Sequence, residues 1–303
     1  MRNIEKYNDF KKNGYLVIKN AFNHSEIEDL RSSCLDAFKD FESTKSVTNE
    51  NSIEKRQIFS KEFTKNPDIL NPLFKKNIIK EIKEIFGEDY ISFADFSLNN
   101  NTLSPIWHID AQSIGLRSKY IYNDSFNIAK LGLYLQENDD EYGGQLDIIP
   151  GSHLPSFLGA NSIISFGKNS HTKISKLQLL AITIRNKFLK KIRLQLEVGD
   201  IILFHALLMH RSSQPDWSKL NQIEGYGIEN PPADKRKFMF QWEVSENNEF
   251  AKFYATHQSK RPANKFQEAS NISISDFNAS SQKLFQENGV NLVPYSKTSL
   301  EKK

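Results

Sequence analysis

From about residue 90 onward, the chain is a succession of short apolar runs that are too brief for helices. These runs are Tyr90–Phe93, Leu131–Gln136, Gln145–Ile149, Ile192–Leu196, Ile201–His205 and Phe238–Val244. Glycine or proline stands between several of them, as at Gly143-Gly144, Pro150-Gly151 and Gly199. Many short strands divided by turn residues are typical of a β-sandwich or a barrel. We therefore predict a mainly β fold for this part of the chain.

Helical patterns precede these strands. After a short apolar run at Gly14–Lys19, Ser25 and Glu28 have the spacing of a capping box, and a helix is expected over about residues 25–41. A second amphipathic helix is expected over Ile78–Phe86, ended by Gly87. Because helices come first and strands follow, the order is not that of a βαβ fold. The chain also contains neither a P-loop nor a glycine-rich dinucleotide fingerprint.

Composition excludes several classes of protein. With 40 basic and 37 acidic residues the net charge is +3, which argues against a dedicated nucleic-acid binder. The single cysteine, Cys34, excludes an intrachain disulfide and a cysteine-based zinc site, and its place on the apolar helix face predicts a buried thiol. No apolar run approaches the roughly 20 residues of a membrane span, and the N-terminus is polar. We expect a cytoplasmic protein with a small-molecule substrate.

The triplet His108-Ile109-Asp110 is the sharpest local feature. Residues two apart in a strand point to the same face, so this imidazole and this carboxylate would project together. Two ligands of one metal ion need that arrangement. The alternative is a salt-bridged His–Asp pair with a purely structural role.

A second histidine would complete a metal site. Two histidines and one carboxylate on one face of the metal are the ligands of non-haem Fe(II) oxygenases. His205 and His210, both in GDIILFHALLMHRSS, are the candidates. Because they are five residues apart, they would face opposite sides of a regular strand, so at most one is expected to bind the metal.

Five segments stand in order over roughly residues 8–245, namely NGYLVIKNAF, WHIDAQS, YLQENDDEYGGQLDIIPGSH, GDIILFHALLMHRSS and KRKFMFQWEV. Together they resemble the phytanoyl-CoA dioxygenase family of Fe(II)/2-oxoglutarate oxygenases. The resemblance implies a double-stranded β-helix, or jelly roll, with flanking α-helices. It also implies Fe(II), 2-oxoglutarate and O2 as cofactors and cosubstrates.

The resemblance assigns roles residue by residue. It implies His108, Asp110 and His210 as the metal ligands and catalytic centre, with Arg236 and Ser212 holding the distal carboxylate of 2-oxoglutarate. A planar guanidinium suits a carboxylate because it donates two parallel hydrogen bonds. His205 and His153 are not expected to bind iron. A carboxylate at position 110 favours hydroxylation, since halogenating relatives have a small residue there.

The sequence departs from the family pattern near the distal histidine. Arg236 lies further from His210 than is usual, across an inserted loop, and Lys235 and Lys237 flank it. The nearer Arg211 neighbours His210 and should point to the opposite face. A lysine that many members have on the strand before the H-x-D motif has no equivalent in SFADFSLNNN.

The domain division places the dioxygenase domain at residues 1–249 and an extension packing on it at 250–303. An insert at about 158–191 carries basic residues and no acidic residue between Leu158 and Lys191, so we expect it to line the entrance for an anionic substrate. Two alternatives to the hydroxylase remain at this point. One is a cupin-like metal isomerase or hydrolase, and the other is a catalytically inactive binding homologue.

Overall fold

The computed structural model describes residues 2–44, 57–59, 63–64, 67–111, 119–137, 139–155, 189–223, 227–258 and 272–295. Its strands are β1 (Tyr15–Ile18), β2 (Gln57–Phe59), β3 (Ile91–Asn100), β4 (Ile128–Tyr134), β5 (Leu146–Ile148), β6 (Ile192–Arg193), β7 (Ile201–His205), β8 (His210–Ser212), β9 (Gln222–Ile223), β10 (Gly227–Ile228), β11 (Phe238–Ser245) and β12 (Asn291–Val293). Its α-helices are α1 (Ile4–Asn13), α2 (His24–Thr44), α4 (Asn71–Phe74), α5 (Lys76–Phe86), α8 (Glu249–Gln258) and α9 (Ala279–Glu287).

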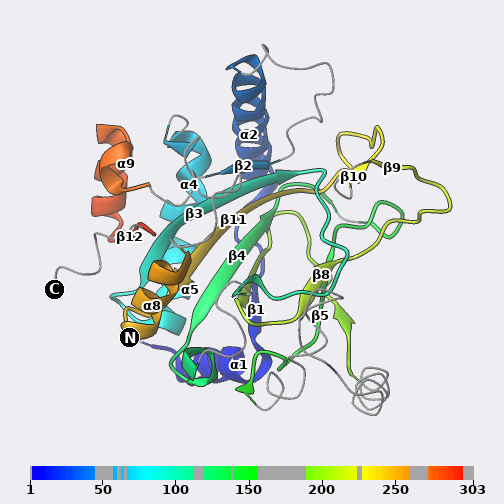
Figure 1. Cartoon of the computed structure of the whole chain (residues 1–303). Helices are drawn as coiled ribbons and strands as arrows, with labels where there is room; N and C mark the ends of the chain where they lie inside the picture. The colour runs from blue at the N-terminus through cyan, green and yellow to red at the C-terminus, as the bar shows by residue number, and fades with distance from the viewer. Residues whose placement is uncertain are drawn as a thin grey trace.

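Two sheets form the β domain. The larger sheet has the order β1-β7-β4-β11-β3-β12, with β2 also paired to β3, and the smaller sheet has the order β6-β5-β8 (Figure 1). Apart from the parallel pair of β12 and β3, the neighbouring strands are antiparallel. Tyr134, Phe204 and Met239 of the larger sheet share one apolar cluster with Leu146 and Ile148 of the smaller sheet. The sheets therefore face each other as a double-stranded β-helix, which confirms the predicted fold class.

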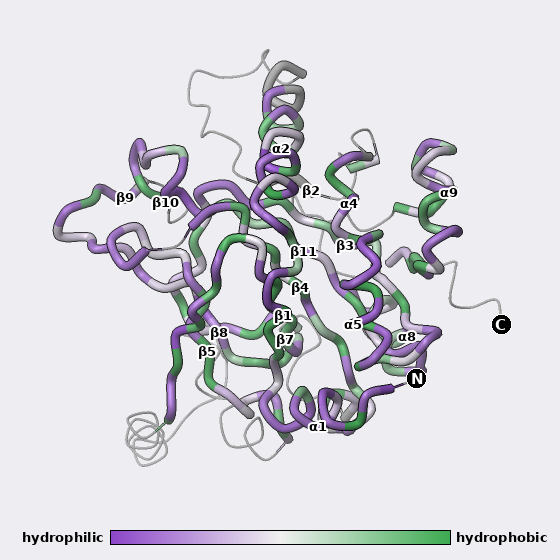
Figure 2. Tube along the Cα trace, turned by 180° about the vertical axis from the view of Figure 1, so that it is seen from behind, coloured by the Kyte–Doolittle hydropathy of each residue, from purple (hydrophilic) through white to green (hydrophobic). Residues whose placement is uncertain are grey.

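The opposite face of the larger sheet is covered by helices. Leu131 and Phe240 of this face belong to one core cluster with Ile27 of α2, Ile82 of α5 and Phe285 of α9. The trace of α2 and α5 in Figure 2 alternates between hydrophobic and hydrophilic colours, as expected for helices with one face against a sheet. The helices thus seal one side of the sheet and leave its inner side to the site.

Both predicted helices are present, with one change at a cap. Helix α5 ends before Gly87 as expected. The capping box at the N-terminus of α2 is formed by Asn23 and Glu26 rather than by Ser25 and Glu28. The Asn23 side chain accepts from the Glu26 amide at 3.0 Å, and the Glu26 carboxylate accepts from the Asn23 amide at 2.8 Å. Asparagine caps as well as serine does, so the earlier residue takes the role.

The strand predictions are confirmed in place and corrected in length. Strand β3 continues to Asn100, beyond the predicted end at Phe93, because polar residues alternate with buried apolar ones along it. By contrast, β6 is shorter than predicted and covers only Ile192–Arg193 of the expected Ile192–Leu196.

The C-terminal segment completes the larger sheet, since β12 pairs with β3 at its edge. Most of the basic insert, residues 158–188, lies outside the described residues, so its expected role at an anionic-substrate entrance stays a prediction. Within the described ranges, no helix is long and apolar enough to cross a membrane.

Candidate metal centre

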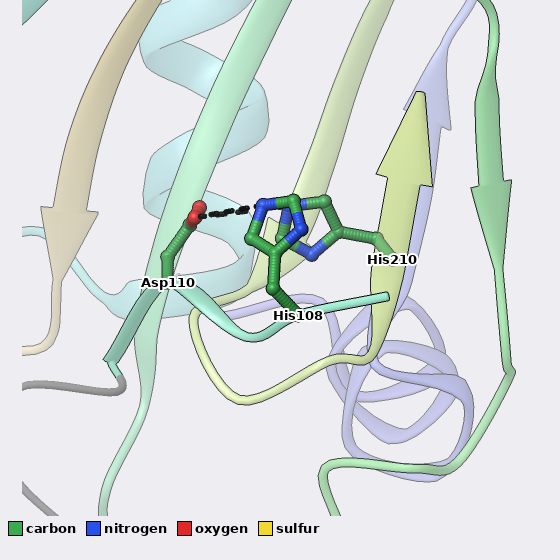
Figure 3. A group of neighbouring side chains, drawn as sticks. All are labelled: His108, Asp110 and His210. Atoms are coloured by element: carbon green, nitrogen blue, oxygen red, sulfur yellow. Dashed lines mark ion pairs between the residues drawn. The ribbon is translucent and has the colours of Figure 1, made fainter. Parts of the chain in front are cut away.

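His108, Asp110 and His210 come together in the fold. Each offers one ligand atom, and the three atoms lie within 4.8 Å of one another. The Nε2 atoms of His108 and His210 are 3.8 and 3.7 Å from Oδ1 of Asp110, and Figure 3 shows both rings directed toward that carboxylate. Ligands that share one ion at about 2.1 Å lie roughly 3–4 Å apart. The three predicted ligands therefore have the spacing of a metal site.

Main-chain pairing sets this spacing. His108 and His210 form an antiparallel bridge in which each amide donates to the other's carbonyl at 3.0 Å. The bridge continues the edge of the smaller sheet at β8, so the two side chains stand beside each other, with ring centroids 4.3 Å apart. Asp110 follows two residues after His108 and projects with it, as the triplet predicted.

Hydrogen bonds fix the tautomers of both rings. Nδ1 of His108 donates to the Ile106 carbonyl at 2.7 Å, and Nδ1 of His210 donates to the Leu208 carbonyl at 2.9 Å. A neutral ring that donates from Nδ1 has its lone pair on Nε2, which is the atom that faces Asp110. Burial also lowers the pKa of His210 to about 3, so this ring is neutral at physiological pH. The residues fit a divalent metal ion.

Lys130 fixes the carboxylate of the set. Its Nζ lies 3.0 Å from Oδ2 of Asp110. Burial opposes ionisation of Asp110, but the Lys130 ammonium outweighs it and holds the pKa of this carboxyl below its usual range. The acid is therefore ionised, with Oδ2 held by Lys130 and Oδ1 directed at the histidines.

His205 and His153 lie apart from the three ligand candidates. Nε2 of His205 donates to the Phe126 carbonyl at 2.7 Å, and Nδ1 accepts from the Leu207 amide at 3.1 Å. Both nitrogens are thus used within the protein. Nε2 of His153 donates to the carbonyl of Lys11 at 3.0 Å, beside the His205 ring. Neither histidine belongs to the metal-ligand group.

Ser212 is buried inside the barrel, and no hydrogen bond joins it to Arg236 among the described residues. Ser212 follows His210 by two residues on β8, so both face inward, whereas Arg236 is half-buried in the turn before β11, where its amide donates to the Pro232 carbonyl. The side chain that reaches Ser212 is the next residue. Nζ of Lys237 donates to Oγ of Ser212 at 3.0 Å, and Lys237 is only 8% exposed.

Lys237 is a buried cation without an acidic partner among the described residues. Burial lowers its pKa to about 8, and the nearby charge of Asp110 only partly opposes this. A buried ammonium is costly unless an anion pairs with it. The Lys237–Ser212 pair therefore fits a carboxylate that is supplied by a ligand.

The predicted glycine pair makes room for this lysine. Gly143 and Gly144 both have positive φ, at 66° and 85°. A Cβ on Gly144 would lie 3.1 Å from Cβ of Lys237, and one on Gly143 would lie 2.7 Å from the Ser213 carbonyl. Only glycine lets this turn pass so close to β8 and to the lysine stem.

Arg211 points away from the site, as its position next to His210 predicts. Its Nε lies 3.1 Å from Oδ2 of Asp147, and its guanidinium lies 4.9 Å from the centre of the Trp107 ring. Arg193 bonds the other oxygen of the same carboxylate at 2.9 Å. These contacts join β5, β6 and β8 on the outside of the smaller sheet.

The profile of the phytanoyl-CoA dioxygenase family matches residues 10–215, which are 206 of the 303 residues. The chain belongs to the phytanoyl-CoA dioxygenase family. Its metal site and this membership make it an oxygenase-type enzyme that depends on Fe(II) and 2-oxoglutarate, with O2 as the oxidant. A search of curated proteins found none that matches the chain.

Solved structures share the family's fold at low identity. EctD from S. alaskensis with 2-oxoglutarate and 5-hydroxyectoine is 16% identical with a TM-score of 0.54, over 97% of this chain and 88% of that one. EctD with bound Fe is 17% identical with a TM-score of 0.53, over 80% and 76%. The α-ketoglutarate-dependent carbocyclase SnoK from nogalamycin biosynthesis is 12% identical with a TM-score of 0.51, over 80% and 83%. At these identities the likeness establishes the fold.

Sequence reasoning missed Lys130 and named Lys237 only as a neighbour of Arg236. Lys130 lies within the apolar strand IAKLGLY, and Lys237 opens the apolar strand FMFQWEVS. A charged residue within a buried strand, or directly before one, is rare, so it indicates a charged or hydrogen-bonding partner. That signal was present in the sequence for both residues.

Proposed function

We propose that this chain hydroxylates a small molecule and that His108, Asp110 and His210 hold the Fe(II). The observation that carries the proposal is the pairing of two features inside one barrel. One is the ligand set with both Nε2 atoms directed at Oδ1 of Asp110. The other is the buried Lys237 ammonium, which no carboxylate of the described residues neutralises.

The protein's part in the reaction is binding and orientation. Bound Fe(II) and 2-oxoglutarate supply the activation of O2, with conversion of the 2-oxo acid to succinate and CO2. Lys237 and Ser212 hold the distal carboxylate of 2-oxoglutarate by charge and hydrogen bond. Lys130 keeps Asp110 ionised and turned toward the metal.

The test of the function is the reaction itself. Fe(II)-loaded protein should consume 2-oxoglutarate and form succinate, and a substrate found by metabolite screening should gain one oxygen atom from O2. A metal isomerase or hydrolase would consume no 2-oxoglutarate. An epimerised or cyclised product with succinate formation would retain the cofactor assignment and replace hydroxylation.

Replacing Lys237 should weaken 2-oxoglutarate binding far more than replacing Arg236. Losing a charge-assisted pair to a buried carboxylate costs a few kcal/mol, so the Lys237→Ala variant should raise the apparent KM for 2-oxoglutarate on the order of a hundredfold. Arg236→Ala is the matched control, with a change of less than about threefold. The reverse ranking would return the role to the originally predicted Arg236.

The same lysine sets a limit at alkaline pH. Only the charged amine pairs with a carboxylate, and burial lowers the Lys237 pKa to about 8. Affinity for 2-oxoglutarate should therefore fall as the pH rises above about 8, by up to tenfold per pH unit. Lys237→Arg should remove this fall, because arginine stays charged. A flat profile for the wild-type protein over pH 7–10 would contradict the role of Lys237.

A further inference from the structure

A buried carboxylate that the reaction does not use lies one side chain away from the metal site. Glu243 on β11 is 2% exposed. It stands directly opposite Lys130 of β4 in the antiparallel ladder, so both side chains project from the same face of the sheet. Nζ of Lys130 lies 3.6 Å from Oε1 of Glu243.

Lys130 joins this carboxylate to the metal ligand. Its ammonium lies between Glu243 and Oδ2 of Asp110, the latter at 3.0 Å. An ammonium has three donors, and buried charges are stable only when they are paired on the sides they present. The position of Lys130, and with it the direction of the Asp110 carboxylate, therefore depends on where the Glu243 side chain is held.

Two tyrosines from the C-terminal part of the chain hold Glu243. The hydroxyl of Tyr254 on α8 donates to Oε2 at 3.0 Å and lies 3.2 Å from Oε1. The hydroxyl of Tyr295, which follows β12, also donates to Oε2. Both rings pack on Phe93 of β3, each with centroids 5.4 Å apart from it. Burial raises the pKa of Glu243 to about 7, and the hydrogen bonds from the two buried hydroxyls orient its carboxyl group.

Both tyrosines lie beyond residue 215, where the family match ends. We infer that Tyr254 and Tyr295 are positioning residues of the metal site, acting through Glu243 and Lys130 on the carboxylate of Asp110. The inference rests on the proposed function of that site. It makes the C-terminal segment part of the active-site architecture as well as an edge strand of the sheet.

The test uses Co(II) as the metal probe in the full-length protein, without 2-oxoglutarate or substrate. Affinity and the visible absorption spectrum of bound Co(II) report the ligands directly. In the double variant Tyr254→Phe/Tyr295→Phe, Co(II) affinity should fall on the order of tenfold and the spectrum should change, since partners behind metal ligands typically contribute 10–100-fold to affinity. Tyr90→Phe is the control, because Tyr90 is equally buried but packs in the helix-side core.

A double-mutant cycle separates positioning from folding. If the tyrosines act through Lys130, their removal should change neither the Co(II) affinity nor the spectrum in a Lys130→Met background. An effect of the same size in both backgrounds would overturn the inference, and so would a double tyrosine variant that binds Co(II) as wild type does. Failure of the wild-type protein to bind Co(II) would overturn both the proposed function and this inference. Normal wild-type binding with unaffected variants would overturn only the inference.

Discussion

Two pairs of neighbouring histidines lie in the described part of this barrel, and only one has the arrangement of a metal site. The rings of His108 and His210 are 4.3 Å apart, and those of His153 and His205 are 4.8 Å apart. In the first pair, each Nε2 faces a carboxylate. In the second pair, each Nε2 is occupied by a main-chain carbonyl.

The difference between the pairs lies in the hydrogen bonds more than in burial. In the metal pair, Nδ1 takes the main-chain bond and leaves Nε2 with a lone pair. In His205 the main chain uses both nitrogens. Nδ1 of His153 lies against Gly14, where a Cβ would come within 2.4 Å of it. A histidine becomes a ligand candidate when its second nitrogen is left free toward an acid.

The largest expected effect is the loss of catalysis on removing a ligand. His108→Ala, Asp110→Ala and His210→Ala should each reduce succinate formation by more than about a hundredfold, because even partners behind metal ligands contribute 10–100-fold to affinity or activity. His205→Ala should retain measurable iron binding. Iron content by elemental analysis and succinate by chromatography measure the two effects. Loss of iron from the His205 variant, with iron retained by the His210 variant, would reverse the comparison.

The metal pair could be predicted from the sequence because its signals are local. The H-x-D spacing and the distal segment with His210 each fit within a few residues. The strands could be predicted in the same way, because each corresponds to a short apolar run in the sequence. Lys130 and Glu243 face each other only through the β4–β11 register, which no local pattern contains. From the sequence, the 2-oxoglutarate carboxylate was assigned to Arg236 rather than to its neighbour Lys237, because sequence alone did not show which residue the turn before β11 directs inward.

A smaller effect is expected on stability when the second pair is broken. His205 is 3% exposed and packs against Phe10 and Phe126. His205→Ala should lower the free energy of unfolding by about 2–4 kcal/mol, since it leaves a cavity and two unpaired main-chain groups. Denaturant titration of the metal-free protein measures this. Added Co(II) should still raise the Tm of this variant but not that of His210→Ala. If Co(II) raised the Tm of the His210 variant but not that of the His205 variant, the assignment of His210 as the metal ligand would be wrong.

The smallest expected effect is the pH dependence of the structural pair. Burial lowers the pKa of His153 to about 4, and burial together with His153 lowers the pKa of His205 well below its usual value. In the unfolded chain both histidines bind a proton below about pH 6.5, whereas in the folded protein they stay neutral to a lower pH. Each group therefore adds stability that is present above about pH 6.5 and is lost as the pH falls toward the folded pKa.

The slope of this loss identifies the histidine responsible. Between pH 4.5 and 6 a single buried neutral histidine contributes about 1.4 kcal/mol of unfolding free energy per pH unit. His153→Gln should lower the measured slope by about that amount, even if the variant is less stable at every pH. Both proteins are measured with a metal chelator present, and comparing their slopes cancels the contribution of His210, which both share. An unchanged slope would mean that His153 already binds its proton in the folded state, and the hydrogen-bond distinction between the two pairs would then fail for this residue.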